Sequence, residues 1–201
     1  VIATKAGLTF PDGVRTVDNS RHALIAELDR SLARIGSDFV DIWQVHSWDP
    51  IAPIDDTLSA LDYAYSTGRA RYVGVSNFTG WQLAQSATKQ ISNSAKAPIT
   101  SIQSEYSLLN RDAEIEILDS AQACGVGFLA WAPLGRGVLT GKYRNGIPSD
   151  SRGAAPHFAK DIAPYLDSRS FYTGNINEIT VRHYAECGVN YVSSGALTHS
   201  V

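Results

Sequence analysis

The chain has 201 residues, of which 44% are hydrophobic and 18% are charged, and its formal net charge is −3. This composition is typical of a globular protein with a sizeable core. The sequence has no basic block of the kind that binds nucleic acid, and it has no apolar run of about 18 residues that could span a membrane.

Strand and helix signals alternate along the chain. Apolar runs predict strands at residues 1–5, 39–46, 71–76, 99–106 and 126–131. Helical spacing and capping residues predict helices between them, from a cap at Asp18, Asn19 or Ser20 to about Ile35, from Pro53 to Gly68, and at 81–89 and 113–123. This alternation is typical of a parallel sheet with crossover helices.

Residues 133–168 break the alternation, because glycines and prolines recur through them. We expect a long loop there with little regular structure. Strand and helix signals then return as a strand at 170–173, a helix at about 177–187 and a strand at 191–194. The total is seven strands, so the expected fold class is α/β, an incomplete or rearranged (β/α)8 TIM-barrel-like structure.

Two of the predicted strands end in reactive side chains. Strand 1–5 ends in Lys5, and strand 39–46 ends in His46. In a parallel α/β barrel the carboxyl ends of the strands meet at the mouth, where catalytic residues lie. The pair could therefore polarise a carbonyl oxygen, although a surface lysine and an ordinary strand-end histidine are the alternatives.

Residues 1 to about 168 resemble the aldo-keto reductase family. The matching segments are Ile2–Lys5, Asp41–His46, Val73–Phe78, Ile102–Asn110 and Trp131–Tyr143. The resemblance implies a (β/α)8 barrel that reduces aldehydes or ketones, small-molecule carbonyl substrates, with NADPH. It also implies that Lys5 and His46 are two members of a catalytic Asp-Tyr-Lys-His tetrad.

The same resemblance implies a set of cofactor-binding residues. Ser76, Asn77 and Gln103 would hold the nicotinamide carboxamide, and Tyr106 would stack on its ring. The loop over the pyrophosphate would contain Leu134, Gly135, Arg136, Gly137, Leu139 and Gly141. For the polar residues the alternative is helix capping, for Tyr106 it is ordinary packing, and for the loop it is a disordered linker.

The tetrad's Asp and Tyr belong to a strand that would precede residue 1, so we expect this chain to be weak or inactive as a reductase. The sequence also contains no methionine and opens inside a strand, which predicts a processed, trimmed or engineered piece. The isolated Cys124 and Cys187 predict reduced thiols and a cytoplasmic protein. Four histidines without metal-ligand spacing predict no metal site and are interpreted as structural or solvated: His22, His157, His183 and His199.

The segment 169–201 resembles a different family, the quinolinate phosphoribosyltransferases, in Thr173–Asn177, Val181–Glu186, Gly188–Tyr191 and Ser194–Ser200. This resemblance implies a βαβ unit with a phosphate cradle at Gly174, Asn175, Gly195 and Ala196. We therefore expect two domains, 1–168 and 169–201, joined in a recombined or engineered chimera. A phosphate-binding transferase fragment and an inactive chimera are the alternatives to a reductase.

An incomplete barrel leaves sheet edges that can pair with another chain. The sequence therefore predicts self-association into a homo-oligomer through unpaired strand edges, or else a large disordered region. We expect neither nucleic-acid nor membrane partners.

Overall fold

The computed structural model describes residues 1–167, and its contacts divide the chain into two compact units. The first unit comprises residues 1–105 and 111–131, and the second comprises 106–110 and continues from residue 132. The expected domain boundary at residue 168 falls at the edge of the described residues and stays a prediction.

A five-stranded parallel sheet forms the centre of the first unit. Its strands lie in the order β1 (Ala3–Ala6), β4 (Val40–Val45), β5 (Ala70–Ser76), β6 (Ile99–Glu105) and β7 (Gly127–Trp131). The predicted α/β class is confirmed, and five parallel strands with crossover helices match an incomplete (β/α)8 barrel. The strands expected at 170–173 and 191–194, and the helix between them, lie outside the described residues.

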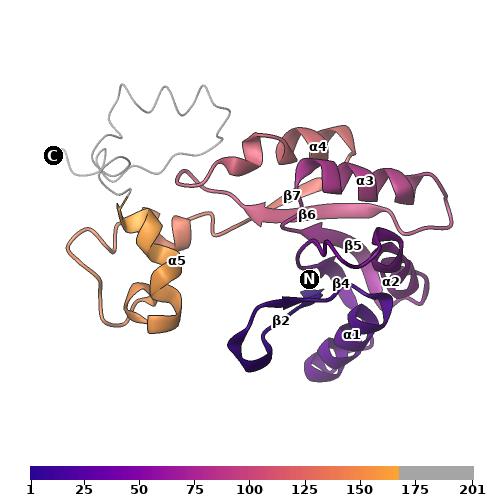
Figure 1. Cartoon of the computed structure of the whole chain (residues 1–201), viewed down its shortest axis with the longest axis horizontal. Helices are drawn as coiled ribbons and strands as arrows, with labels where there is room; N and C mark the ends of the chain where they lie inside the picture. The colour runs from indigo at the N-terminus through magenta and orange to yellow at the C-terminus, as the bar shows by residue number, and fades with distance from the viewer. Residues whose placement is uncertain (168–201) are drawn as a thin grey trace. The chain divides into compact units, whose positions relative to one another are not determined.

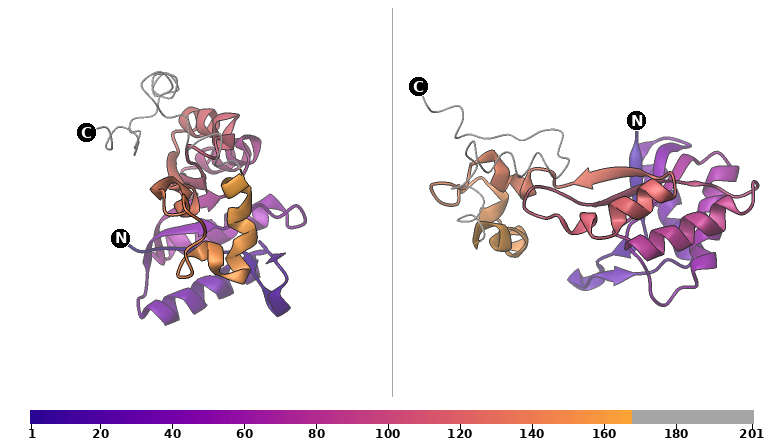
Figure 2. Two further views of the ribbon diagram at one scale, coloured as in Figure 1. Left: turned by 90° about the vertical axis from the view of Figure 1, so that its left-hand side faces the viewer. Right: turned by 90° about the horizontal axis from the view of Figure 1, so that it is seen from above.

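Four helices cover one face of this sheet (Figure 1; Figure 2). They are α1 (Arg21–Ile35), α2 (Ile54–Ser66), α3 (Gly80–Ile91) and α4 (Ile117–Ala123). Helix α1 shows how local sequence sets their bounds: the Ser20 side chain accepts a hydrogen bond from the Ala23 N–H over 3.4 Å, and the helix ends at Gly36 with a φ of 71°. Each helix contacts a strand that it follows or precedes.

The two faces of the sheet differ in chemistry because successive side chains of a strand alternate between them. A buried apolar row meets the helices and lies in the hydrophobic core: Ala6, Val45, Val75 and Ile102. The neighbouring row points to the other face: Lys5, Gln44, Gly74 and Ser101. The polar and small residues of the second row therefore line the face that a closed barrel would enclose.

Two details of the first unit differ from the prediction. An antiparallel hairpin that the sequence did not predict follows β1: β2 (Leu8–Thr9) and β3 (Thr16–Val17) pair with each other and are connected through η1 (Pro11–Gly13). Strands of two residues are too short to show a hydrophobic period. The helix expected from residue 113 instead begins at Ile117, after a 3₁₀ turn, η2 (Asp112–Glu114).

The prediction of a long loop with little regular structure at residues 133–168 is wrong. The second unit contains the 3₁₀ helices η3 (Gly135–Thr140) and η4 (Arg152–Ala154) and the α-helix α5 (Pro156–Asp167). Pro156 occupies the first position of α5, where proline is favoured. Pro164 lies inside the helix, where it removes a backbone hydrogen-bond donor. Packing offsets that cost, because Ile162 is buried against the cluster of Val138 and Tyr143.

Candidate active site

The carboxyl ends of all five parallel strands surround one cavity of about 300 Å³ in the first unit. Six residues line it: Lys5, His46, Ser76, Asn77, Gln103 and Trp131. Five of these residues are the ones that the sequence predicted as catalytic or cofactor-binding. The structure therefore brings together side chains that are separated by up to about one hundred residues in the chain, while their roles stay predictions.

Lys5 is half-buried near the end of β1. Burial lowers the pKa of its amine, because desolvation disfavours the charged form. Within residues 1–167, the amine makes no hydrogen bond and no ion pair, whereas the Lys89 amine lies 2.8 Å from an Asp55 oxygen. Among residues 1–167, burial is thus the influence on this amine that the structure shows.

A hydrogen bond joins two side chains of the row that contains Lys5. Gln44 Nε2 donates a hydrogen bond to Ser101 Oγ over 3.1 Å and passes across Gly74, which lies between them in the sheet. A Cβ at Gly74 would lie 2.3 Å from that hydroxyl oxygen, so the bridge requires glycine there. The row that contains Lys5 therefore continues across the sheet with a buried amide, bare backbone and a hydroxyl.

His46 follows β4 directly, and its backbone N–H donates to the carbonyl of Ala6 over 2.8 Å. That bond extends the β1–β4 pairing and places the imidazole at the rim that Lys5 also reaches. Burial lowers the pKa of His46, and the positive charges of Lys5 and Arg15 lower it further. Arg15 comes from the β2–β3 hairpin, where its guanidinium donates to Ser47 Oγ over 3.0 Å.

Asn77 connects the ends of the strands around the cavity. Its φ of 54° turns the chain sharply after β5, and its N–H donates to the carbonyl of Gln103 over 2.8 Å. Its amide nitrogen donates to the His46 carbonyl over 2.9 Å and to Ser76 Oγ over 3.1 Å, while its amide oxygen accepts from Trp131 Nε1 over 3.0 Å. Both amide hydrogens of Asn77 are therefore engaged, which leaves one oxygen lone pair for a ligand.

The loop after His46 is held by two buried side chains. The Asn19 amide nitrogen donates to the Ser47 carbonyl over 2.8 Å, and the Asn19 N–H donates to Asp49 Oδ2 over 3.0 Å. Asp49 Oδ1 accepts from the Ile51 N–H over 2.8 Å. Burial raises the pKa of Asp49, but these backbone donors outweigh it and the net pKa is lowered. The rim next to His46 is thus fixed by an ionised carboxylate.

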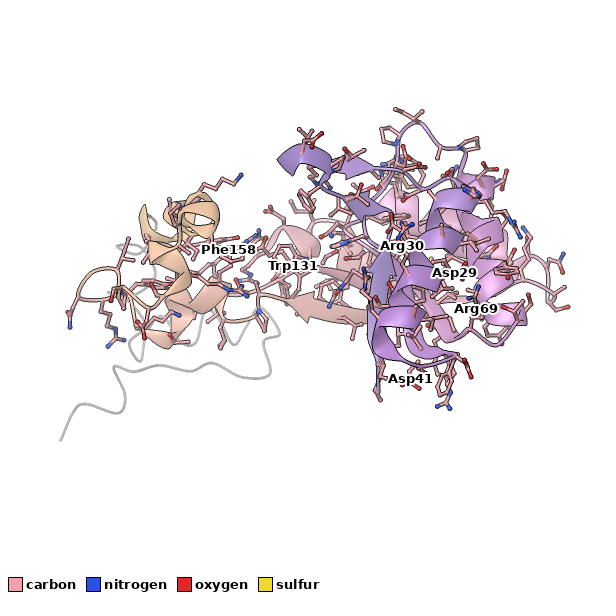
Figure 3. All side chains as sticks on the ribbon, turned by 90° about the horizontal axis from the view of Figure 1, so that it is seen from below. Asp29, Arg30, Asp41, Arg69, Trp131 and Phe158 are labelled. Carbon is pink, nitrogen blue, oxygen red and sulfur yellow. The ribbon has the colours of Figure 1, made fainter. Side chains whose placement is uncertain are left out.

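Trp131 is the lining residue that sequence reasoning missed. It ends β7, and Figure 3 shows it at the opposite end of the sheet from Asp41, which lies near the start of β4. The rule that selected Lys5 and His46, a functional side chain at the carboxyl end of a parallel strand, applies equally to this tryptophan. Its indole supplies the aromatic surface of the cavity.

The other predicted cofactor residues do not lie in the first unit. Tyr106 and the loop of Leu134, Gly135, Arg136, Gly137, Leu139 and Gly141 belong to the second unit, so their relation to the cavity stays a prediction. Within that unit most of the loop forms the 3₁₀ helix η3. The predicted phosphate cradle at Gly174, Asn175, Gly195 and Ala196 lies outside the described residues.

The described part of the chain offers neither a metal-binding cluster nor a membrane-spanning helix. Residues 1–167 contain no cluster of three or more histidine, cysteine, aspartate or glutamate side chains that could hold a metal ion. None of the helices within that range is long and apolar enough to cross a bilayer.

Comparison with known proteins matches residues 1–193 to the family described as "Aldo/keto reductase family". The chain is 41% identical over 153 residues to L-glyceraldehyde 3-phosphate reductase of Escherichia coli (strain K12), a match that covers 76% of this chain and 44% of the relative. It is 32% identical over 163 residues to aldo-keto reductase YhdN of Bacillus subtilis (strain 168), with coverage of 80% and 47%. The chain therefore spans less than half the length of these relatives.

The family match crosses the junction near residue 168 that the sequence suggested. Nothing in these comparisons shows a segment that resembles a phosphoribosyltransferase. The chimera consequently stays a prediction without support from known proteins.

Proposed function

The chain belongs to the aldo/keto reductase family, and from that premise we propose that its cavity binds NADPH and orients an aldehyde or ketone for reduction. The observation that carries this proposal is the convergence of an amine, an imidazole, a set of hydroxyl and amide groups and an indole on one cavity. These groups match the separate needs of a nicotinamide ring and of a carbonyl oxygen.

The polar lining fits a carboxamide. Ser76 and Gln103 lie opposite each other in the β5–β6 pairing, and together they offer donors and acceptors to an amide. The free lone pair of Asn77 adds one more acceptor. The indole of Trp131 is the flat apolar surface of the cavity on which an aromatic ring would stack. When bound, the dinucleotide supplies the hydride.

Lys5 and His46 would act on the carbonyl substrate. Negative charge develops on the carbonyl oxygen during reduction, and donors fixed in advance stabilise that charge. The His46 imidazole is held at the rim by backbone pairing, and Lys5 contributes a positive electrostatic field beside it. The six lining residues include no carboxylate, so nothing on that lining repels the developing oxyanion.

Short aldehydes are the first substrates to test. Two relatives that are 41% identical to this chain carry the name L-glyceraldehyde 3-phosphate reductase, and the cations Lys5 and Arg15 near His46 suit an anionic aldehyde. The expectation that the 201-residue chain turns over slowly is tested in the same assay by following NADPH absorbance with glyceraldehyde 3-phosphate.

NADPH binding is tested by fluorescence titration of the wild-type chain and of two variants. Gln103→Ala removes one amide from the cavity lining and should weaken binding about 5- to 10-fold, since a lost hydrogen bond costs about 1 kcal/mol. Gln122→Ala, at an exposed position of α4, should leave binding unchanged. Equal affinity for NADPH in all three proteins would refute the assignment of this cavity, and no NADPH binding by the wild type would refute the proposed function for this chain.

A further inference from the structure

The β2–β3 hairpin carries an arginine to the rim of the cavity. The hairpin begins two residues after β1, whose carboxyl end contributes Lys5 to the cavity lining (Figure 1). The Arg15 guanidinium donates a hydrogen bond to Ser47 Oγ over 3.0 Å, and Ser47 directly follows His46 in the chain. The pKa of His46 is lowered by burial first and then by the charges of Lys5 and Arg15. The positive charge of the hairpin therefore reaches the imidazole.

The hairpin is tied to the rim at its base as well as through Arg15. The Asp18 N–H donates to the Gly7 carbonyl over 3.2 Å, which closes the hairpin next to β1. Gly7 has a φ of 92°, and a Cβ at that position would clash with Asn19 Oδ1. The Asn19 side chain in turn donates to the Ser47 carbonyl over 2.8 Å. Ser47 thus receives one hydrogen bond from each side of β3, and these bonds give the guanidinium a defined position.

The guanidinium has N–H groups left for an anion. Arginine carries five N–H donors in a planar fork, and the bond to Ser47 uses one of them. The ion pairs within residues 1–167 do not include Arg15. The carboxylates of Asp18 and Asp49, on the adjoining segments, accept backbone N–H groups instead. Such a fork binds phosphate oxygens two at a time.

We propose that Arg15 is a specificity-determining residue, which binds the phosphate of a small phosphorylated aldehyde whose carbonyl group lies in the cavity. The role in specificity rests on the proposed reductase function, whereas the phosphate site itself does not require the dinucleotide. The substrate is divided between two places: the carbonyl lies at His46, and the phosphate lies beyond the cavity lining at the exposed guanidinium.

The neighbouring groups favour a phosphate. Ser47 Oγ accepts from Arg15, so its own O–H can donate to a further phosphate oxygen. The cavity volume of about 300 Å³ accommodates a carbon chain of a few atoms between the two places. Because Arg15 is exposed, the phosphate keeps part of its hydration when it binds, and the cost of desolvation is small.

The test is isothermal titration calorimetry of the full 201-residue chain without NADPH. The probe is sn-glycerol 3-phosphate, which has the phosphate but no carbonyl, and glycerol is the uncharged comparison. The wild type should bind the phosphate and give no signal with glycerol. Arg15→Gln should weaken binding about 10-fold or more, because hydrogen bonds to a charged group are lost. Arg15→Lys keeps the charge without the fork and should weaken binding only a few-fold.

Arg34 provides a matched control in the same unit. It is also an exposed arginine whose guanidinium donates to a serine hydroxyl, Ser31 Oγ, over 3.2 Å, but it lies in the last turn of α1. Arg34→Gln removes the same charge and should bind sn-glycerol 3-phosphate as the wild type does. An equal loss in both variants would reduce the effect to the overall charge of the chain and would overturn the proposal.

Two further measurements separate this site from a structural role and from the cofactor. Saturating sn-glycerol 3-phosphate should raise the pKa of His46, followed by NMR, in the wild type but not in Arg15→Gln, because the bound anion offsets the charge of Arg15. The affinity for NADPH, measured by fluorescence, should be the same in both proteins, and a loss in Arg15→Gln would assign the guanidinium to a cofactor phosphate instead.

The calorimetry decides the proposal without any step of catalysis. Equal affinity of the wild type and Arg15→Gln for sn-glycerol 3-phosphate, or no binding by the wild type, would overturn it. Absence of NADPH binding by the wild type, with the phosphate still bound through Arg15, would instead refute the proposed reductase function.

Discussion

The indole Nε1 of Trp131 donates a hydrogen bond to Oδ1 of Asn77 over 3.0 Å, although 54 residues separate the two in sequence. Asn77 also donates through its amide nitrogen to the carbonyl of His46. One side chain thereby joins the ends of β4, β5 and β7 around the cavity. The geometry of the candidate active site depends on this connection, and the first prediction tests it.

Replacement of Asn77 should destabilise the first unit. Asn77→Ala removes three side-chain hydrogen bonds and places a Cβ-bearing residue without local polar compensation at a φ of 54°. We expect a loss of about 2–3 kcal/mol in the free energy of unfolding, measured by urea denaturation. Asn77→Gly loses the same bonds but tolerates the backbone conformation, so it should be about 1 kcal/mol more stable than Asn77→Ala. Two variants of equal stability would contradict the role assigned to the left-handed turn.

Gly74 should not accept alanine. An alanine Cβ would lie 2.3 Å from Ser101 Oγ and 2.4 Å from the Ser101 carbonyl oxygen, and backbone cannot give way as a flexible side chain can. Gly74→Ala should therefore cost about 1–3 kcal/mol of unfolding free energy, the usual range for overpacking. Gly127→Ala is the matched control in the same row of the sheet, because its Cβ would meet only the Thr100 carbonyl, at 3.4 Å. The prediction fails if thermal unfolding shifts equally for both variants.

The depressed pKa of His46 should appear as a pH dependence of stability. Burial and the charges of Lys5 and Arg15 lower its pKa in the folded chain below 6.5. The unfolded chain therefore binds a proton more readily, so stability is complete above about pH 6.5 and is lost as pH falls toward the folded-state pKa.

Replacing the imidazole should remove part of that pH dependence. Between pH 8 and pH 5, unfolding free energies from urea denaturation should fall less for His46→Gln than for the wild type. His22→Gln, at an exposed position in the first turn of α1, should follow the wild-type curve. A His46→Gln curve parallel to that of the wild type would show that His46 does not carry this dependence.

The sequence predicted the strand ends well because parallel strands leave a simple signal. The run from residue 39 to His46 is mostly apolar, with Asp41 and Gln44 as the exceptions, and its polar terminus marks the rim of the sheet. The same reasoning selected Lys5, whereas the family resemblance selected Ser76, Asn77 and Gln103, and the structure places all of these residues on one cavity. Trp131 was missed because an aromatic residue at a strand end can equally well belong to the hydrophobic core.

The second unit was predicted poorly because its structure depends on contacts distant in sequence. Glycines and prolines in residues 133–168 suggest a loop when each is considered locally. Helix α5 forms nonetheless, since Ile162 is buried with Val138 and Tyr143, and the Tyr143 hydroxyl accepts from the Gly153 N–H over 3.2 Å. Local propensity is a weak constraint where burial of this kind is possible.

The amino-acid sequence by itself determined the alternation of strands and helices, the parallel sheet, and Lys5 and His46 at its carboxyl edge, because periodicity and strand termini are local properties. The tertiary structure alone decided which of these residues share hydrogen bonds, such as those of the Asn77 amide with Trp131 and His46. It also decided that Lys5 lies in a cavity without an ion-pair partner among residues 1–167. Burial and charge at a site are sums over groups from distant segments, and only the folded chain brings those groups within range of one another.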